Sequence, residues 1–328
     1  MIQQTILVTG GSGFIGVETC KQLVAAGYNV INIDRNRKKK EIAGVTHYPF
    51  DIANSQVKGI IQLTRPDAII HLAAEHEVER SFTEPGVYFH NNISNTIELL
   101  NHAAEAGVKK FIFASSSSVY GNRQTTEGSY VPTAFREDEP FNALSPYSKS
   151  KQVIEELLPA YEAAYGIKSV VLRYHNAAGA SKDLKHGYTQ KPHAHLIPIV
   201  CHAAIHGETV TVNRDMHGES TDSSCFRDYT HLVDVARSNL DAIKYLENGE
   251  SNTFNIGRNE PHDAMYVIQK LNTITNKPIS STMGPPRKGD PMITNADLTK
   301  TKKLLGWKPA YAIDDIILDA YNWELKQK

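Results

Sequence analysis

Short apolar runs alternate with longer amphipathic stretches over the first half of the chain. The runs are rich in β-branched residues, which is typical of strands buried within a parallel sheet. The longer stretches have apolar residues at helical spacing. The predicted strands are Thr5–Thr9, Asn29–Asp34, Ala68–His71, Lys110–Ala114 and Lys168–Tyr174, and the predicted helices are Phe14–Ala26, Gly86–Ala106 and Tyr147–Tyr165. This alternation predicts an α/β fold with a doubly wound parallel sheet of the Rossmann type, covered by helices on both faces.

The pattern becomes irregular after residue 175, with scattered Pro, Gly and His residues. This change predicts a smaller C-terminal α/β domain made of residues 176–227 and 258–328. Residues 1–175 then form the first domain, and residues 228–257 rejoin it. The polar stretch from Gly121 to Asn142 is too long for an ordinary connection inside a compact domain, and such loops are functional or mobile.

Charge and cysteine usage narrow the classes of partner. The chain has 35 Lys and Arg against 36 Asp and Glu, so no net charge attracts nucleic acid or an anionic membrane. The basic run Arg37 to Lys40 is interpreted as a solvated loop. Three cysteines at scattered positions suit a reducing compartment and show no metal-site pattern. We expect no bound metal, no nucleic acid and no membrane partner.

The N-terminus has no charged or apolar leader of the signal-peptide type, and no apolar run is long enough to cross a bilayer. We therefore expect a cytoplasmic protein.

A glycine-rich turn, Gly10-Gly11-Ser12-Gly13-Phe14-Ile15-Gly16, joins the first strand to the first helix. Glycines there permit a tight turn and let a pyrophosphate approach the amides at the positive end of the helix. Asp34 ends the second strand, where a carboxylate meets ribose hydroxyls. It would repel a ribose phosphate, so NAD is favoured over NADP, although Arg35 and Arg37 leave an opening for NADP. A glycine turn without ligand is the alternative.

The segment Ser145 to Lys151 has the pattern of a helix start, with Ser145 as the N-cap and Pro146 at the first helical position. Tyr147 and Lys151 are four residues apart and share one face of this helix. A phenol has a pKa of about 10, and nearby cations such as the lysine ammonium and an oxidised nicotinamide favour its phenolate. Beside a dinucleotide loop, we interpret the pair as a general base and its activator. A surface Tyr-x-x-x-Lys pair is the alternative.

Hydroxyl side chains cluster at the carboxyl end of a predicted strand, from Ser115 to Ser118. Open α/β sheets bind ligands at that end of their strands. One of these serines is predicted to face the substrate. The alternative is that they only bond the turn backbone, which we expect of one or two of them.

Together these motifs resemble the extended short-chain dehydrogenase/reductase family, and within it most closely the UDP-glucose (UDP-galactose) 4-epimerases. The resemblance spans nearly the whole chain. It includes the glycine turn, Tyr147-x-x-x-Lys151, Asp51-Ile52, His71-Leu72-Ala73-Ala74, Asn91-Asn92, Arg173-Tyr174-His175-Asn176, His195-Leu196-Ile197-Pro198, Phe226-Arg227-Asp228-Tyr229-Thr230-His231, Arg287-Lys288-Gly289-Asp290 and Leu305-Gly306-Trp307-Lys308-Pro309.

The resemblance implies a role for each matched position. Tyr147, Lys151 and Ser116 would be catalytic, with Ser116 bonding the sugar 4-hydroxyl. The residues implied in NAD binding are Gly10, Gly13, Phe14, Ile15, Gly16, Asp34, Asp51, Ile52, Ala73, Asn92, Tyr147 and Lys151. The residues implied in nucleotide-sugar binding are Ser116, Asn176, His195, Arg227, Arg287, Asp290 and Thr294. Arg227 and Arg287 suit a diphosphate because a guanidinium offers forked donors.

The resemblance also implies a reaction and a homodimer. Tyr147 would take the proton of the 4-hydroxyl while hydride passes to NAD, and the resulting 4-keto sugar would turn over and receive the hydride on its other face. Thr294 replaces a bulky tyrosine that restricts substituents at C2, so some activity on N-acetylated UDP-hexosamines is predicted. His76, His175 and Asn95 depart from the usual lysine, phenylalanine and glycine.

Three other readings remain open. A 4,6-dehydratase typically has acids after the serine, where this chain has Ser117 and Ser118. A UDP-uronate epimerase, or another nucleotide-sugar enzyme of the family, shares the serine cluster but typically differs around Arg173 to Asn176. An NAD-binding regulatory scaffold would have lost the chemistry, which intact Tyr147, Lys151 and Ser116 argue against.

Overall fold

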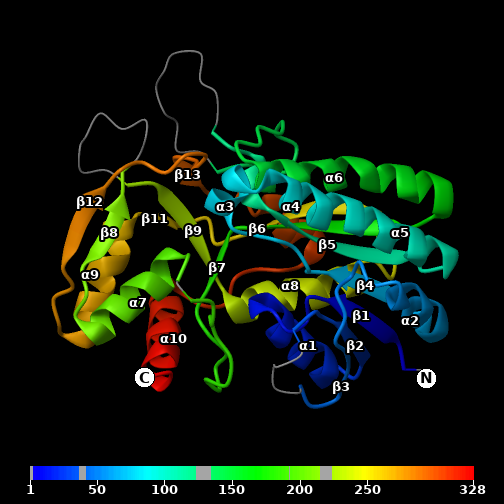
Figure 1. The fold of residues 1–328 in the computed structure, drawn as a ribbon, viewed down its shortest axis with the longest axis horizontal. Coiled ribbons are helices and arrows are strands. Elements are labelled where there is room, and N and C mark those ends of the chain that lie inside the picture. Colours follow the sequence, from blue (N-terminus) through cyan, green and yellow to red (C-terminus); the bar gives the residue numbers. More distant parts are fainter. Residues whose placement is uncertain (1–2, 37–41, 123–133, 192, 215–223) are drawn as a thin grey trace.

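A seven-stranded parallel sheet forms the larger part of the molecule in the computed structural model (Figure 1). The structure describes residues 3–36, 42–122, 134–191, 193–214 and 224–328. The sheet has the order β10-β6-β5-β4-β1-β2-β3. Its strands are β1 (Thr5–Thr9), β2 (Asn29–Ile33), β3 (Val45–Tyr48), β4 (Ala68–His71), β5 (Lys110–Ser116), β6 (Lys168–Tyr174) and β10 (Asn252–Ile256). The predicted fold class is confirmed.

Helices cover both faces of this sheet (Figure 1). Alternate residues of β1 belong to different cores: Ile6 and Val8 pack with α1 (Phe14–Ala25) and α8 (Leu232–Tyr245). Leu7 packs in the opposite core with α2 (Gln56–Thr64), α5 (Asn95–Glu105) and α6 (Pro146–Tyr165). Because strand side chains alternate, an apolar run such as this one satisfies both faces at once.

The connections reverse direction at β1. From β1 the chain builds outward through β2 and β3, and then returns to place β4, β5 and β6 on the other side. Ligands bind open α/β sheets outside the carboxyl ends of the strands at such a reversal. We therefore expect a ligand site at the turns that follow β1, β4 and β5.

A second, smaller group of elements lies beside the large sheet (Figure 1). Strand β9 (Phe226–His231) pairs with β7 (Asn176–Ala178), β11 (Pro261–His262) and β13 (Ile293–Thr294), and β8 (Val210–Asn213) pairs with β12 (Ser281–Gly284). The helices α7 (Leu196–His206), α9 (Ala264–Thr275) and α10 (Ile313–Lys326) pack around its own apolar core. After β9, the elements α8 and β10 return the chain to the large sheet. The precise domain boundaries stay a prediction.

The predicted helix Gly86–Ala106 is interrupted in the structure. It divides into α4 (Pro85–Phe89), a wide π-helical segment at His90–Ser94, and α5. A π segment inserts extra residues into the helix and is frequent at functional sites. Here it carries Asn91 and Asn92, whose side chains contact Glu75. The remaining short helical elements are α3 (Val78–Thr83), the 3₁₀ turn Ser117–Val119 and the π turn Thr301–Leu305.

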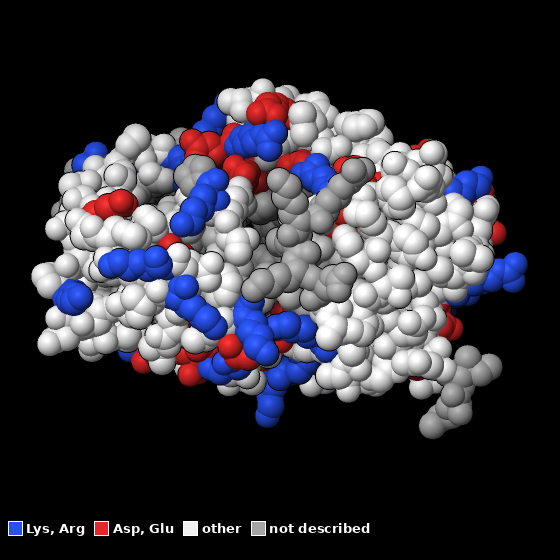
Figure 2. Space-filling model, turned by 60° about the horizontal axis from the view of Figure 1, so that its bottom comes forward, with Lys and Arg blue, Asp and Glu red and all other residues white. Residues whose placement is uncertain are grey.

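Surface charge and hydropathy agree with the balanced composition. On the face drawn in Figure 2, basic and acidic side chains lie near one another, with large uncharged areas between them. Among the described residues, no helix has both the length and the apolar character to cross a membrane. The basic run Arg37 to Lys40, and residues 123–133 of the predicted loop from Gly121 to Asn142, lie outside the described residues.

Candidate functional site

A cavity of about 1120 Å³ opens at the carboxyl ends of the large sheet and extends to the smaller group of elements. Its volume exceeds the range of about 300 to 1,000 Å³ that is usual for small-ligand sites. The predicted site residues that line it are Gly10, Gly13, Phe14, Ile15, Gly16, Asp34, Asp51, Ile52, Ala73, Ser116, Tyr147, Lys151, Asn176, His195, Arg227, Arg287, Asp290 and Thr294. One cavity thus brings together every predicted site residue except Asn92.

Two glycines of the turn, Gly10 and Gly16, leave no room for a side chain. A Cβ on Gly16 would lie 2.2 Å from the carbonyl oxygen of Gly10, and a Cβ on Gly10 would lie 2.7 Å from the amide nitrogen of Ala73. Gly10 also has a φ of 73°, which favours glycine. Gly13 occupies the N-cap of α1 and offers no side chain to the first-turn amides. A pyrophosphate could therefore approach those amides, as the sequence predicted.

We expect Gly16→Ala to lower NAD affinity by at least about tenfold, because the turn must shift to move the Gly10 carbonyl away from the new methyl group. Isothermal titration with NAD measures this effect. Gly59→Ala on α2 is the control, because a Cβ at Gly59 would have no atom within 4 Å. Unchanged affinity in Gly16→Ala would contradict the role given to the turn.

Asp34 is fixed by the backbone at the edge of the cavity. Its Oδ2 accepts a hydrogen bond from the amide of Ser12 at 3.0 Å, and its Oδ1 accepts one from the amide of Asn36 at 2.8 Å. The carboxylate is therefore held in place beside the glycine turn. This arrangement fits the free ribose hydroxyls of NAD.

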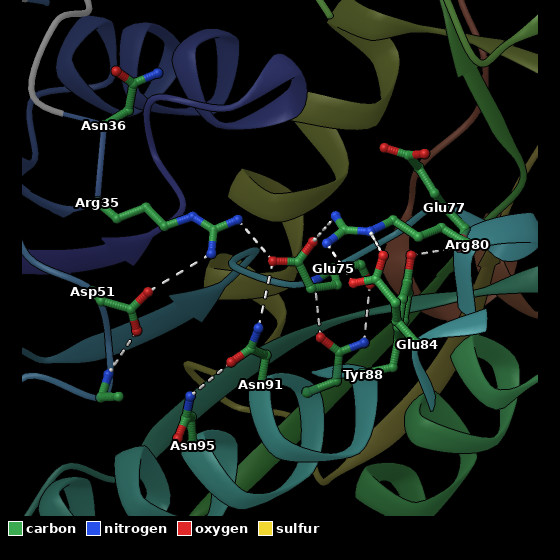
Figure 3. Close-up of polar contacts among 12 residues, drawn as sticks. Arg35, Asn36, Asp51, Glu75, Glu77, Arg80, Glu84, Tyr88, Asn91 and Asn95 are labelled. Carbon is green, nitrogen blue, oxygen red and sulfur yellow. Dashed lines mark hydrogen bonds and ion pairs between the residues drawn. The ribbon is translucent and has the colours of Figure 1, made fainter. Parts of the chain in front are cut away.

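The cation next to Asp34 is already engaged with carboxylates (Figure 3). Arg35 bonds Glu75 at 2.7 Å, and its other terminal nitrogen lies 3.8 Å from Asp51. Arg80 contacts the second oxygen of Glu75 at 3.6 Å. A ribose phosphate would need Arg35 as its partner, but Arg35 is already bonded to Glu75. This contact supports the prediction that the cofactor is NAD and not NADP. Arg37 lies outside the described residues.

Asn92 does not line the cavity but contacts Glu75, which does. It is buried, its side-chain oxygen accepts a hydrogen bond from the Glu75 amide at 2.9 Å, and its amide group donates to the Glu75 carbonyl and to Ser150. It therefore holds the Glu75 backbone in place, and its direct contact with NAD, which the resemblance implied, stays a prediction. Sequence reasoning did not select Glu75, although its place just after β4 was a usable signal.

Tyr147 and Lys151 face the cavity from the first turns of α6. The predicted cap is confirmed: the Ser145 hydroxyl accepts a hydrogen bond from the amide of Ser148 at 3.1 Å, and the Ser148 hydroxyl accepts one from the Ser145 amide. Lys151 is buried and its Nζ donates to the carbonyl of Ala114 at 2.7 Å. The cap and this hydrogen bond fix the helix start against the end of β5.

Ser116 stands at the end of β5 beside Tyr147. Its hydroxyl oxygen accepts hydrogen bonds from the amide of Ser118 at 3.2 Å and from the Ser118 hydroxyl at 3.0 Å. Ser115 instead bonds Glu155. All four serines line the cavity, and Ser116 is the one whose side chain bonds the Tyr147 phenol.

Burial is the largest influence on the pKa values of Tyr147 and Lys151. It raises the pKa of Tyr147, which the neighbouring Ser116 hydroxyl counteracts. Burial also lowers the pKa of Lys151 to about 7, and Glu155, one helical turn further along α6, opposes that shift. The neighbour that lowers the Tyr147 pKa in the structure is therefore Ser116, whereas the sequence argument assigned this effect to Lys151.

Charged and polar groups gather at the far end of the cavity. Arg227 forms an ion pair with Asp290, and Arg287 lies 3.6 Å from Glu79. Asn176 donates to the hydroxyl of Thr294 at 3.2 Å. Here the two arginines can meet an anionic ligand.

The three predicted departures from the family pattern, His76, His175 and Asn95, all line the cavity. His76 stacks on His195 with ring centroids 6.0 Å apart. Burial lowers the pKa of both rings, that of His195 to about 4, so both are neutral near pH 7. A neutral imidazole stack thus stands where a lysine is usual, and it adds no positive charge beside the cofactor region.

Comparison with known proteins gives a consistent result. UDP-glucose 4-epimerase of Lacticaseibacillus casei is 36% identical, over 97% of this chain and 96% of its own. UDP-glucose 4-epimerase of Bifidobacterium longum, solved with NAD⁺ and UDP, superposes with a TM-score of 0.89 at 30% identity and 98% coverage of both chains. The enzyme of Thermotoga maritima, solved with UDP-glucose, gives 0.85 at 32% identity and 99% coverage of both.

The family model described as the NAD dependent epimerase/dehydratase family matches residues 6–257, which include the glycine turn, Ser116, Tyr147 and Lys151. With this match and these relatives, the chain belongs to the NAD-dependent epimerase/dehydratase family.

Proposed function

We propose that the protein is an NAD-dependent UDP-hexose 4-epimerase, which interconverts UDP-glucose and UDP-galactose through a 4-keto intermediate. One observation carries the proposal: Ser116, Tyr147 and Lys151 share a single cavity with the glycine turn at one end and Arg227 and Arg287 at the other. The relatives named UDP-glucose 4-epimerase support it, because they match this chain over nearly its full length.

The residues present fit NAD. The glycine turn would hold the pyrophosphate and Asp34 the adenine ribose, with Asp51, Ile52 and Ala73 along the same wall. Asn92 would act through Glu75. When bound, NAD supplies reversible hydride acceptance at the sugar C4.

Tyr147 moves the proton in the proposed reaction. Its phenolate oxygen takes the proton of the sugar 4-hydroxyl as the C4 carbonyl forms, and it returns a proton to the 4-oxygen when the other epimer is made. Ser116 would bond the same sugar oxygen and orient it toward Tyr147. The lowered pKa of Lys151 allows this lysine to exchange protons near neutral pH.

The substrate's diphosphate would bind at the far end of the cavity. Arg227 lines the cavity there, and its ion pair with Asp290 holds its side chain in place. Asn176, His195 and Arg287 would complete the nucleotide-sugar site. A guanidinium binds phosphate through two parallel donors, which gives orientation as well as attraction.

The neighbours of Ser116 favour epimerisation over dehydration. Ser117 is buried, and Ser118 donates its hydroxyl hydrogen bond back to Ser116. An elimination needs an acid and a base near C5 and C6 of the sugar, and these two positions supply hydroxyls instead.

A product assay tests the proposal. We expect the purified protein to convert UDP-galactose to UDP-glucose without an added oxidant, and to convert UDP-glucuronate at less than about a tenth of that rate. Faster turnover of UDP-glucuronate would favour the uronate epimerase. Bound NAD without turnover of any nucleotide sugar would favour the regulatory scaffold.

Thr294 is proposed to leave room for a substituent at C2 of the sugar. It is buried in the cavity wall and accepts the hydrogen bond of Asn176. We expect wild-type protein to act on UDP-N-acetylgalactosamine, and Thr294→Tyr to lose this activity by at least about tenfold because the larger side chain fills the space. Activity of Thr294→Tyr on UDP-galactose is the internal control. Equal losses on both substrates would contradict this role.

The homodimer and the cytoplasmic location stay predictions. Light scattering of the purified protein tests the first, and a mass of one 36.4 kDa chain would contradict it.

A further inference from the structure

A cluster of metal-ligand side chains lies outside the proposed reaction. It consists of His193 before α7, His202 on α7 and Glu324 on α10, two helices that pack side by side (Figure 1). Nε2 of His193 lies 3.2 Å from Oε1 of Glu324, and Nδ1 of His202 lies 2.8 Å from the same oxygen. Within the described part of the chain, the three ligand atoms all lie within 4.8 Å of one another.

The hydrogen-bond inventory of His193 points to a cation. Its Nδ1 lies 3.1 Å from the carbonyl oxygen of Gln190, while its Nε2 faces the carboxylate of Glu324. Both partners are acceptors, but a neutral imidazole carries only one N–H. If Nδ1 donates to Gln190, the lone pair of Nε2 faces a carboxylate oxygen. Two electron-rich atoms then face each other, and a second proton or a bound cation between them would remove the repulsion.

His202 also directs one ring nitrogen toward Glu324. Its Nδ1 faces Glu324, and its Nε2 lies 3.9 Å from Oε1 of Glu208. Histidines that bind metals typically give their other ring N–H to a carbonyl or carboxylate, which fixes the tautomer. The Gln190 carbonyl is in place for this second role at 3.1 Å from His193, while Glu208 lies at ion-pair distance from His202. Each imidazole has its other nitrogen oriented toward Glu324.

We propose that His193, His202 and Glu324 form a binding site for a divalent transition ion of the Zn²⁺ class. Two imidazoles and one carboxylate are a known ligand set for zinc, and bonds of about 2.0 to 2.2 Å place tetrahedral ligands roughly 3.3 to 3.6 Å apart. The observed separations of 2.8 and 3.2 Å from the Glu324 oxygen are hydrogen-bond distances and are shorter than this spacing, so the side chains would move apart by less than about 1 Å to admit the ion. The side chains of His193 and Glu324 are only 7% and 6% exposed, so they are shielded, while His202 is 27% exposed and opens a path for the ion.

The ion would fasten α10 to the segment that precedes α7. His193 and Glu324 themselves line the large cavity, and Trp323 of α10 donates to the carbonyl of Tyr188 in the same region. The site is therefore structural, and it supports one wall of the cavity. This inference does not depend on the proposed reaction.

Metal titration of the full chain tests the site. We expect chelator-treated protein to bind one Zn²⁺ per chain, and a concentration of about 100 times Kd to raise Tm by about 5 °C. His193→Gln, His202→Gln and Glu324→Gln should each weaken binding by at least about tenfold. His90→Gln, an exposed histidine elsewhere, should bind as wild type does.

His206 distinguishes the proposed site from a simpler one. It lies one turn after His202 on α7, is exposed, and has its ring 4.2 Å from the ring of His202. In the proposed site it is not a ligand, so His206→Gln retains Zn²⁺ binding. Loss of binding in His206→Gln together with full binding in His193→Gln would show an exposed histidine pair and overturn the proposal. So would absence of stoichiometric Zn²⁺ binding, which leaves two histidines hydrogen-bonded to Glu324.

Discussion

Tyr147→Phe is expected to lower kcat for UDP-galactose by about 10³-fold, with little change in KM. The phenylalanine keeps the ring that packs edge-on against Tyr88 but removes the hydroxyl beside Ser116. General acid–base catalysis is typically worth about 10² to 10⁴ in rate. Tyr174, the strand partner of Ser116, also lines the cavity, but its hydroxyl donates to Asn239. Steady-state kinetics with UDP-galactose measure the loss.

Tyr161→Phe provides a matched control on the same helix. Tyr161 donates its hydroxyl hydrogen bond to Asn101 at 2.8 Å and does not line the cavity. This variant should keep the wild-type kcat. If Tyr147→Phe retained full activity, or if both variants lost activity to the same extent, the proton-transfer role of Tyr147 would be wrong.

Glu155→Gln is expected to have the largest effect on stability. Glu155 and Arg173 form an ion pair of 2.8 Å with both side chains 4% exposed, and Arg173 also stacks over the ring of Tyr120. Removing one partner of a buried pair leaves an uncompensated charge, which costs about 3 to 5 kcal/mol of unfolding free energy. Denaturant unfolding of the two proteins measures the difference.

Glu84→Gln is the control for this substitution. Glu84 pairs with Arg80 at 2.8 Å, but both side chains are more than 40% exposed and solvent screens their attraction. Its denaturation midpoint should stay close to that of wild type. A Glu155→Gln variant as stable as Glu84→Gln would show that the buried pair is not needed to stabilise the junction of α6 with β6.

The strands and the cofactor turn could be predicted because their signals are local. Buried parallel strands such as Lys168–Tyr174 need an unbroken apolar run, and the glycine turn places its constraints on consecutive residues. Strand β3 was missed because it is half exposed and only four residues long. The π-helical segment at His90–Ser94 was missed because its cause is tertiary: Asn92 turns inward to hold Glu75.

Contacts between distant segments explain the remaining differences. Glu75 pairs with Arg35 across 40 residues of sequence, and His193 contacts Glu324 across 131. We expected no bound metal because the cysteines show no metal-site pattern. Cysteine spacing could not reveal the cluster of His193, His202 and Glu324, which come from three separate segments. Likewise, spacing placed Tyr147 and Lys151 on one helix face, but only the fold shows how burial shifts their pKa values.

The central claim is that this cavity moves hydride and proton at C4 of a UDP-hexose without exchange of the hydride with solvent. UDP-galactose deuterated at C4 tests it most directly. We predict that the wild-type protein forms UDP-glucose that keeps the deuterium at C4, as measured by mass spectrometry and NMR. UDP-glucose without deuterium at C4, or no UDP-glucose at all, would contradict the account.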